Sequence, residues 1–185
     1  MEIGTGNSQG AEPVIQADGK IVVVGESFVG TKSVFLVLRY NADGSLDTTF
    51  DDDGRVFTDF PGSIGARGLA AAIQSDGKIL VAGSMGNGSQ GFFTIVRYNS
   101  DGSLDNTFDG DGRVTFVFGT NTTNTPRDIK IQADQKIVVV GETSAAGSAP
   151  PFSDFAVARL NSDGTLDNSF GTNGRVITDF LARPD

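Results

Sequence analysis

The sequence predicts an all-β fold built from three tandem copies of one four-stranded unit, and three observations support this prediction. First, the block at 15–21 returns at 73–79 and at 131–137, so that it repeats every 58 residues along the 185-residue chain. Second, β-branched and aromatic runs alternate with Gly, Asn and Asp in each copy. Third, no segment shows the 3.6-residue period of an amphipathic helix over ten or more residues.

Two further blocks mark the later part of each copy. The first of these begins at Arg39, Arg97 and Arg159, and the second begins at Gly54, Gly112 and Gly174. Because the spacing lengthens from 58 to 62 residues, the third copy carries a four-residue insertion between Gly141 and Arg159. We expect one repeat domain over 1–185, with units at about 11–60, 68–118 and 126–180.

The middle copy serves to place the strands. We expect strand a at 69–74, strand b at 78–83, strand c at 92–98 and strand d at 113–118. The dipeptide Asp76-Gly77 between strands a and b predicts a type I′ turn, in which both central residues have positive φ. Gln135 replaces this glycine in the third copy, so we expect it to be strained or to force a different turn.

Strand b is a continuous apolar run rather than an alternating one, since both 21–24 and 137–140 read IVVV. Such a strand needs cover on both faces. Four-stranded units covered on both faces are typical of the blades of a β-propeller, which stack around an axis. The small residues at 70–72 in strand a fit a position where blades crowd near that axis.

The blocks IQSDGKILVAG, RYNSDGSLDNTF and DGRVTF, with their spacing, closely resemble the delta-60 repeat family of bacterial proteins, regarded as β-propeller repeats of unknown function. The resemblance runs from Val14 to Phe180. It implies a propeller and, commonly, a large secreted or cell-surface protein, and it brings no catalytic residues. Gln135 and Leu160 depart from the pattern, because the other copies have glycine and tyrosine there.

Three blades are too few to close a ring, because propellers have about four to eight. Two apolar blade faces would be left in water, where such faces are interaction surfaces or aggregation hazards. We therefore expect self-association into a homodimer, which would close a six-bladed ring. The alternatives are excision from a longer repeat array, or a three-fold β-prism or β-trefoil, which do close with three units.

The amino-acid composition excludes several classes of function. A net charge of -9 and a pI of about 4.4 would repel a phosphate backbone, so we expect no nucleic-acid partner. The chain has no histidine and no cysteine, which excludes Ser-His and Cys-His nucleophile pairs. Residues 1–13 lack the basic and apolar regions of a signal peptide, so we expect no targeting signal in this chain and no membrane insertion.

The connection between strands c and d is long and acidic. Asp51, Asp53, Asp109 and Asp111 are weak calcium candidates, because Ca²⁺ takes six to eight oxygen ligands. The third copy has Gly171 and Asn173 at the positions of Asp51 and Asp53. We therefore favour a structural role for these aspartates, as turn formers, and expect no required cofactor.

Five segments differ between the copies: 26–33, 61–68, 84–91, 119–126 and 142–154. In an up-and-down meander all five lie at one end of the blades, which is called the variable face below. Repeat proteins place variation on the face that binds. The candidate ligand- or partner-binding residues on this face are Phe28, Met85, Asn87, Asn121 and Phe152.

The sequence favours a non-enzymatic binding or structural module, part of a bacterial surface or secreted assembly as the resemblance implies, with a glycan or protein as partner. The alternative is a polysaccharide hydrolase or lyase, because some propellers use paired carboxylates near the axis. Glu12, Asp128 and Lys130 fall on strand a near that axis, but they do not recur and show no partnered acid.

Overall fold

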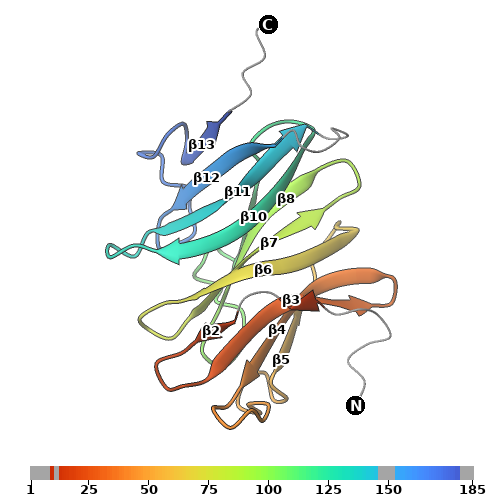
Figure 1. The fold of residues 1–185 in the computed structure, drawn as a ribbon, viewed down its shortest axis with the longest axis vertical. Helices are drawn as coiled ribbons and strands as arrows, with labels where there is room; N and C mark the ends of the chain where they lie inside the picture. Colours follow the sequence, from red (N-terminus) through yellow and green to blue (C-terminus); the bar gives the residue numbers. More distant parts are fainter. Residues whose placement is uncertain (1–8, 11–12, 146–152, 180–185) are drawn as a thin grey trace, which may run out of the picture.

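The structure is a computed structural model, and it describes residues 9–10, 13–145 and 153–179. Every regular element in these residues is a β-strand, and the strands form three antiparallel sheets, as Figure 1 shows. Each sheet is one copy of the repeat, and the sheets are called blades 1, 2 and 3 in chain order. None of the residues described is part of a helix long and apolar enough to cross a membrane.

The strands of each blade follow one another in chain order. Strand a of blade 1 has two short pieces, β1 (Gln9–Gly10) and β2 (Val14–Ile15), and is followed by β3 (Ile21–Val29), β4 (Lys32–Tyr40) and β5 (Arg55–Thr58). Blade 2 consists of β6 (Gly65–Ile73), β7 (Ile79–Gly86), β8 (Gly91–Tyr98) and β9 (Arg113–Phe116). Blade 3 consists of β10 (Thr122–Ile131), β11 (Ile137–Ala145), β12 (Asp154–Leu160) and β13 (Arg175–Thr178). The prediction of three four-stranded units is confirmed.

Strands a and b are longer than the sequence predicts. In blade 2, β6 starts at Gly65 rather than at residue 69, and β7 runs to Gly86 rather than ending at residue 83. A bulge between Gly68 and Ala70 absorbs one residue, which allows the ladder to continue to the Gly65–Gly86 pair. A matching bulge interrupts β10 in blade 3. The segments of the variable face are therefore partly strand.

The turn between strands a and b is not the predicted type I′. Gly77 has a positive φ of 84°, whereas Asp76 does not. The Gly77 N–H donates to the Gln74 carbonyl, and the Gln74 N–H donates to the Lys78 carbonyl. This is the pattern of a three-residue loop that ends in a left-handed residue. Gln135 adopts a φ of 65° in the same kind of turn, so the strained alternative is the one that occurs.

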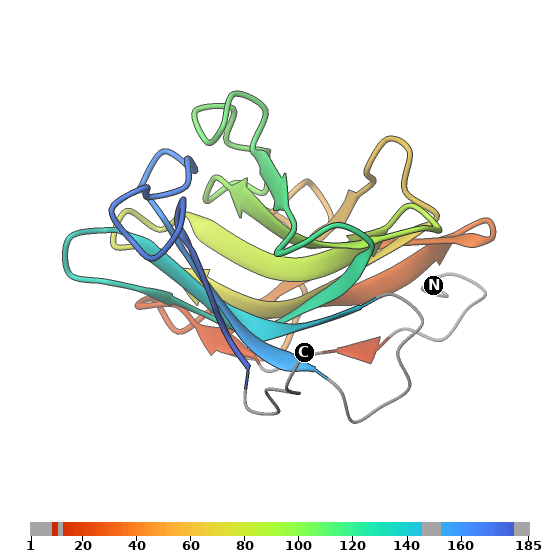
Figure 2. The same cartoon turned by 90° about the horizontal axis from the view of Figure 1, so that it is seen from above.

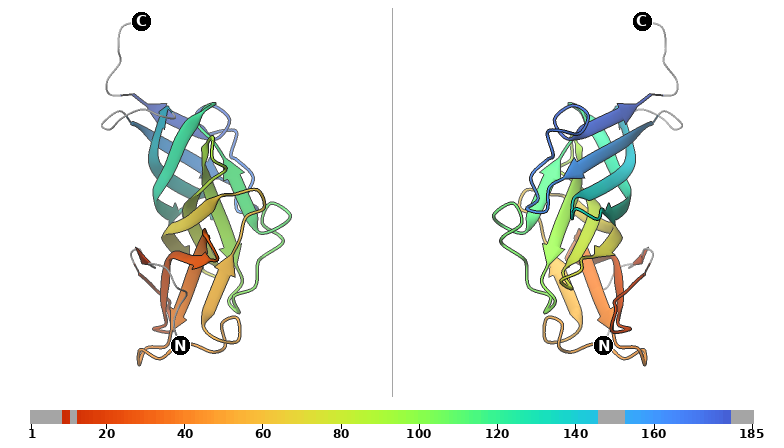
Figure 3. Two further views of the ribbon diagram at one scale, coloured as in Figure 1. Left: turned by 90° about the vertical axis from the view of Figure 1, so that its right-hand side faces the viewer. Right: turned by 90° about the vertical axis from the view of Figure 1, so that its left-hand side faces the viewer.

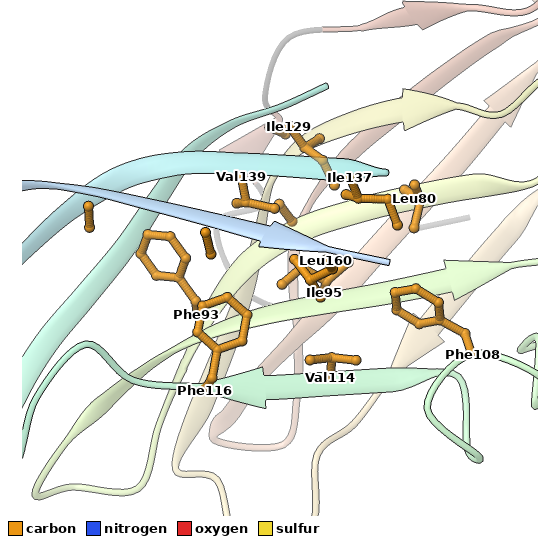
Figure 4. Packing of buried hydrophobic residues seen from close by; sticks show 14 residues of the cluster. Leu80, Phe93, Ile95, Phe108, Val114, Phe116, Ile129, Ile137, Val139 and Leu160 are labelled. Atoms are coloured by element: carbon orange, nitrogen blue, oxygen red, sulfur yellow. The ribbon is translucent and has the colours of Figure 1, made fainter. Parts of the chain in front are cut away.

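The blades stack face to face along the longest dimension of the molecule, as the view along the stack in Figure 2 and the side views in Figure 3 show. An apolar cluster fills each of the two spaces between blades. Figure 4 shows the cluster between blades 2 and 3, with Leu80, Phe93 and Ile95 of one blade against Ile137 and Leu160 of the other. Stacking explains why strand b is apolar on both faces.

Two glycines allow neighbouring blades to approach closely. A Cβ on Gly83 of blade 2 would collide with the ring of Phe35 of blade 1. A Cβ on Gly141 of blade 3 would collide with the ring of Phe93 of blade 2 in the same way. The repeated glycine of strand b is thus needed for packing.

Candidate functional site

The connections between strands divide between the two ends of the blades. In Figure 1 the turns that join β2 to β3, β6 to β7 and β10 to β11 lie to the left, and the connections β3–β4 and β7–β8 lie to the right. A meander reverses at every turn, so the connections between strands c and d share the first end. This end, which carries residues 16–20 and 41–54 and their counterparts, is called the scaffold end.

Each blade has one charged cluster at the scaffold end, built on a repeated aspartate. In blade 2, the Asp105 carboxylate accepts a hydrogen bond from Arg97 Nε at 2.7 Å and forms an ion pair with Lys78 Nζ at 2.9 Å. Its other oxygen accepts from the N–H and the hydroxyl of Thr107. The same cation pairing occurs around Asp47 in blade 1 and Asp167 in blade 3.

The pKa of the aspartate in each cluster is that of a structural ion pair. Burial by itself raises the pKa of Asp105, but hydrogen bonds from Thr107 and Lys78 and the charge of Arg97 outweigh it. The pKa of this carboxyl therefore lies well below its ordinary range. Because a depressed pKa recurs in all three blades, we assign these groups to the scaffold.

The aspartates considered for calcium lie at the scaffold end and form turns. Asp53 and Asp111 each accept the N–H of the arginine two residues further on, at 2.9 Å. Asp51 and Asp109 have φ of 49° and 50°. Burial, and after it the neighbouring carboxylates, raise the pKa of Asp51. Within the described ranges, no three acidic, His or Cys side chains converge in a way that could hold a metal ion.

Phe28 and Met85, two candidates of the variable face, lie on strands rather than in loops. Phe28 is half-buried near the end of β3, opposite Ser33 of β4. Met85 in β7 is also half-buried and packs against the cluster between blades 1 and 2. Among the described residues of the five variable segments, the exposed large apolar side chains are Val29 and Ile64, at 61% and 68%. Sequence reasoning missed them because single apolar residues beside turns give no periodic signal.

Asn87 and Asn121 lie on two connections that touch each other. Asn87 Oδ1 accepts the N–H of Gln90 at 2.9 Å and so shapes the β7–β8 turn. Asn121, with a φ of 54°, ends the connection from β9 to β10. Gln90 Nε2 donates to the Gly119 carbonyl at 3.0 Å, which joins the two connections. Phe152, the fifth candidate, lies outside the described residues.

Asn124 organises the same region and was not predicted. Its side chain is 1% exposed, and its Nδ2 donates to the Gly91 carbonyl at 2.7 Å and to Thr122 Oγ1 at 2.8 Å. Its Oδ1 accepts from the Thr143 hydroxyl at 2.8 Å and from the Phe118 N–H at 3.3 Å. Because Asn124 joins blades 2 and 3, the variable face between them is held in place.

Strand a of each blade (β2, β6 and β10) borders a groove of about 500 Å³, lined by residues 13–15, 69–73 and 127–131. Asp128 lies there, with Lys130 Nζ 2.7 Å from its carboxylate. Among the groove-lining residues that the structure describes, Asp128 is the one carboxylate, and Glu12 is not among those residues. Glycosidases need two carboxyl groups roughly 5 to 10 Å apart. Within the described part of the groove lining, no second carboxyl group accompanies Asp128.

The sequence was compared with known proteins. A family model described as a β-propeller domain of unknown function (DUF5122) matches residues 16–50, 74–108 and 132–170, more than half of the chain. Each match begins at the turn between strands a and b of one blade. No curated protein matches the sequence. The prediction of β-propeller repeats is confirmed, and the stacked sheets agree with it rather than with a prism or trefoil.

Proposed function

Because the chain belongs to this family of β-propeller repeats of unknown function, we propose that it is a non-enzymatic binding or structural module. The chain supplies three blades, and a second copy completes the ring to six. A glycan or protein partner binds at the variable face. As the family resemblance implies, the expected location is a bacterial cell surface or a secreted assembly.

The contrast between the two ends of the blades carries this proposal. At the scaffold end, the repeated aspartate pairs with the same arginine and the same lysine in every blade. At the variable face, blade 1 has a two-residue turn between β3 and β4, and blade 2 has the four residues 87–90 between β7 and β8. Variation in length concentrated at one end of the blades is typical of a repeat protein that binds there.

The side chains of the variable face fit a partner of mixed polarity. Val29 and Ile64 are exposed, and the amides of Asn87 and Gln90 stand on the neighbouring turn. Isolated apolar groups beside amides suit a sugar face or a protein loop better than a charged polymer. The Gln90–Gly119 bond holds two of the connections together, so the face is partly organised before binding.

Binding to a defined glycan panel and to purified candidate surface proteins tests the proposal. We expect Val29→Ser with Ile64→Ser to weaken binding at least about tenfold, equivalent to about 1.4 kcal/mol. Phe57→Ser is the matched control, since Phe57 is 47% exposed but lies on the outer strand β5. Equal losses in both variants, or no binding by the wild type, would contradict a binding role for this face.

The same glycan panel separates the module from the hydrolase or lyase alternative. A binding module leaves every glycan intact, and Asp128→Asn leaves its affinity unchanged, because Asp128 lies in the axial groove rather than on the variable face. New reducing ends that disappear in Asp128→Asn would replace the module with an enzyme.

A further inference from the structure

The two interfaces between neighbouring blades repeat one set of contacts at the scaffold end. Phe50 of blade 1 lies against Gly102 of blade 2, since a Cβ on that glycine would be 3.2 Å from the ring. Phe108 of blade 2 lies against Gly164 of blade 3, where the corresponding distance is 3.0 Å. Both phenylalanines are fully buried. A ring of one blade thus occupies space that glycine leaves open on the next.

Two hydrogen bonds accompany each of these rings. Arg39 Nη1 donates to the Ser100 carbonyl at 2.5 Å, and the Asp51 N–H donates to the Asp101 carbonyl at 2.8 Å. Between blades 2 and 3, bonds of the same lengths join Arg97 to Ser162 and Asp109 to Asp163. We call the ring, the guanidinium and the N–H the projecting side, and the glycine and the two carbonyls the receiving side.

Blade 3 carries a projecting side that meets no further blade among the residues that the structure describes. By the repeat spacing its members are Phe170, Arg159 and the N–H of Gly171. Phe170 is partly exposed, in contrast to its two buried counterparts. The Arg159 side chain is 22% exposed, whereas those of Arg39 and Arg97 are 5% and 7% exposed.

Blade 1 carries the matching receiving side. Gly44 corresponds to Gly102 and Gly164, and the carbonyls of Ala42 and Asp43 correspond to the two acceptors. A Cβ on Gly44 would meet nothing within 4 Å, so its space is open. Gly44 has a φ of 85°, in keeping with the 96° and 95° of its counterparts, so the backbone already has the conformation that the contact requires.

The apolar face beside this receiving side is open as well. Ile15 is 71% exposed, and Ile21 and Val23 are partly exposed, whereas their counterparts Ile79 and Val81 in blade 2 are fully buried. Val34 and Leu36, nearer to the variable face, are buried. The open part of blade 1 therefore lies next to the receiving side.

One matched pair of side chains distinguishes the interfaces from each other. Between blades 1 and 2, the Thr58 and Tyr98 hydroxyls share a buried hydrogen bond of 2.5 Å. At the equivalent positions between blades 2 and 3, Phe116 and Leu160 lie in one apolar cluster, so both members have changed together. The same positions on the outer blades are Thr178 of blade 3 and Tyr40 of blade 1. Blade 3 thus carries the threonine and blade 1 the tyrosine of a possible further polar pair.

We infer that blade 3 of one copy binds blade 1 of a second copy through this set of contacts, with Phe170 against Gly44, Arg159 Nη1 on the Ala42 carbonyl and the Gly171 N–H on the Asp43 carbonyl. The inference rests on the proposed two-copy ring and specifies its interface. With two such interfaces around a two-fold axis, the projecting side of blade 3 and the receiving side of blade 1 are occupied in both copies. The partner is a second copy because its blade 1 offers glycine, two carbonyls and Tyr40 where blade 3 needs them.

Light scattering after size-exclusion chromatography tests the interface through Gly44→Asn. Asparagine tolerates positive φ better than other residues, and the open space at Gly44 lets the single chain fold. Its side chain would stand where the Phe170 ring of the partner must lie. We expect the wild type near twice 19.3 kDa and the variant near 19.3 kDa at the same concentration.

Gly30→Asn is the matched control. Gly30 has a φ of 65° and nothing within 4 Å of an added Cβ, but it lies in the β3–β4 turn at the variable face. We expect this variant to keep the wild-type mass. A dimer that survives Gly44→Asn, or that Gly30→Asn also abolishes, would overturn the interface while leaving the two-copy ring in place.

A pair exchange gives a second test that depends less on folding. Tyr40→Leu alone and Thr178→Phe alone each leave one mismatched partner, and we expect both to weaken the dimer. The double variant recreates the Phe116–Leu160 pair and should recover the wild-type mass. If the double variant weakens the dimer by the sum of the two single effects, positions 40 and 178 are not paired. If the wild type keeps a mass of 19.3 kDa at all concentrations, the ring itself is wrong. If the wild type instead forms an assembly larger than a dimer, and Gly44→Asn abolishes that assembly, only the count of six blades is wrong.

Discussion

Gln135 occupies the left-handed position of its turn, which Gly19 and Gly77 occupy in the other two blades. Its φ of 65° is close to their 83° and 84°, and the turn keeps the same hydrogen bonds. A side chain with a Cβ in this region costs about 1 kcal/mol or more. We therefore expect Gln135→Gly to raise the free energy of unfolding by about 1 kcal/mol, measured by urea denaturation. Gly77→Gln, the reverse change in blade 2, should lower it by a similar amount.

The charged cluster is the element-scale feature that recurs in every blade, and it makes folding sensitive to pH. Asp105 has a pKa below its ordinary range in the folded state, so its contribution is present above about pH 4, the unfolded value. The contribution is lost as the pH falls through the folded-state pKa. With Asp47 and Asp167 behaving alike, we expect stability to drop steeply below about pH 4 in a series of urea melts.

Removing Asp105 takes the carboxylate partner from the buried Arg97 and leaves Lys78 with only the more distant, exposed Asp76. Asp105→Asn should therefore cost about 3 kcal/mol at pH 7 and flatten the acid side of the stability profile. Asp76→Asn is the control, because Asp76 is 56% exposed and lies 3.8 Å from Lys78. The expected change there is at most about 1 kcal/mol. Equal effects of the two substitutions would show that the cluster does not stabilise the blade.

At the scale of the whole molecule, the stability of the three-bladed chain is expected to depend on dimer formation. If the ring is completed by a second copy, the folded state gains stability by mass action. A tenfold rise in protein concentration should then add about 1.4 kcal/mol per dimer, seen as a higher Tm in differential scanning calorimetry. The Tm of Gly44→Asn should be independent of concentration. A wild-type Tm that is also independent of concentration would mean that each chain folds without a partner.

The candidate site was only partly predictable from the sequence. Copy-to-copy comparison indicated which segments vary, but it did not show that Phe28 and Met85 lie on strands and are half-buried. The bulge in β6 and the continued ladder extend the strands into Gly- and Ser-rich segments whose local preference is for turns. Asn124 was missed because its hydrogen-bond partners come from two blades.

The sequence by itself determined the all-β class, the repeat, the count of three units and the residues that each blade shares, because these depend on periodic patterns within one chain. Only the tertiary structure decided which of the repeated residues touch the next blade. Phe50 and Gly102 are 52 positions apart and belong to different copies, so no local pattern links them. Contacts between blades depend on stacking, so only the stack shows that Phe170 is partly exposed and that the space beside Gly44 is open, the two observations on which the inferred interface rests.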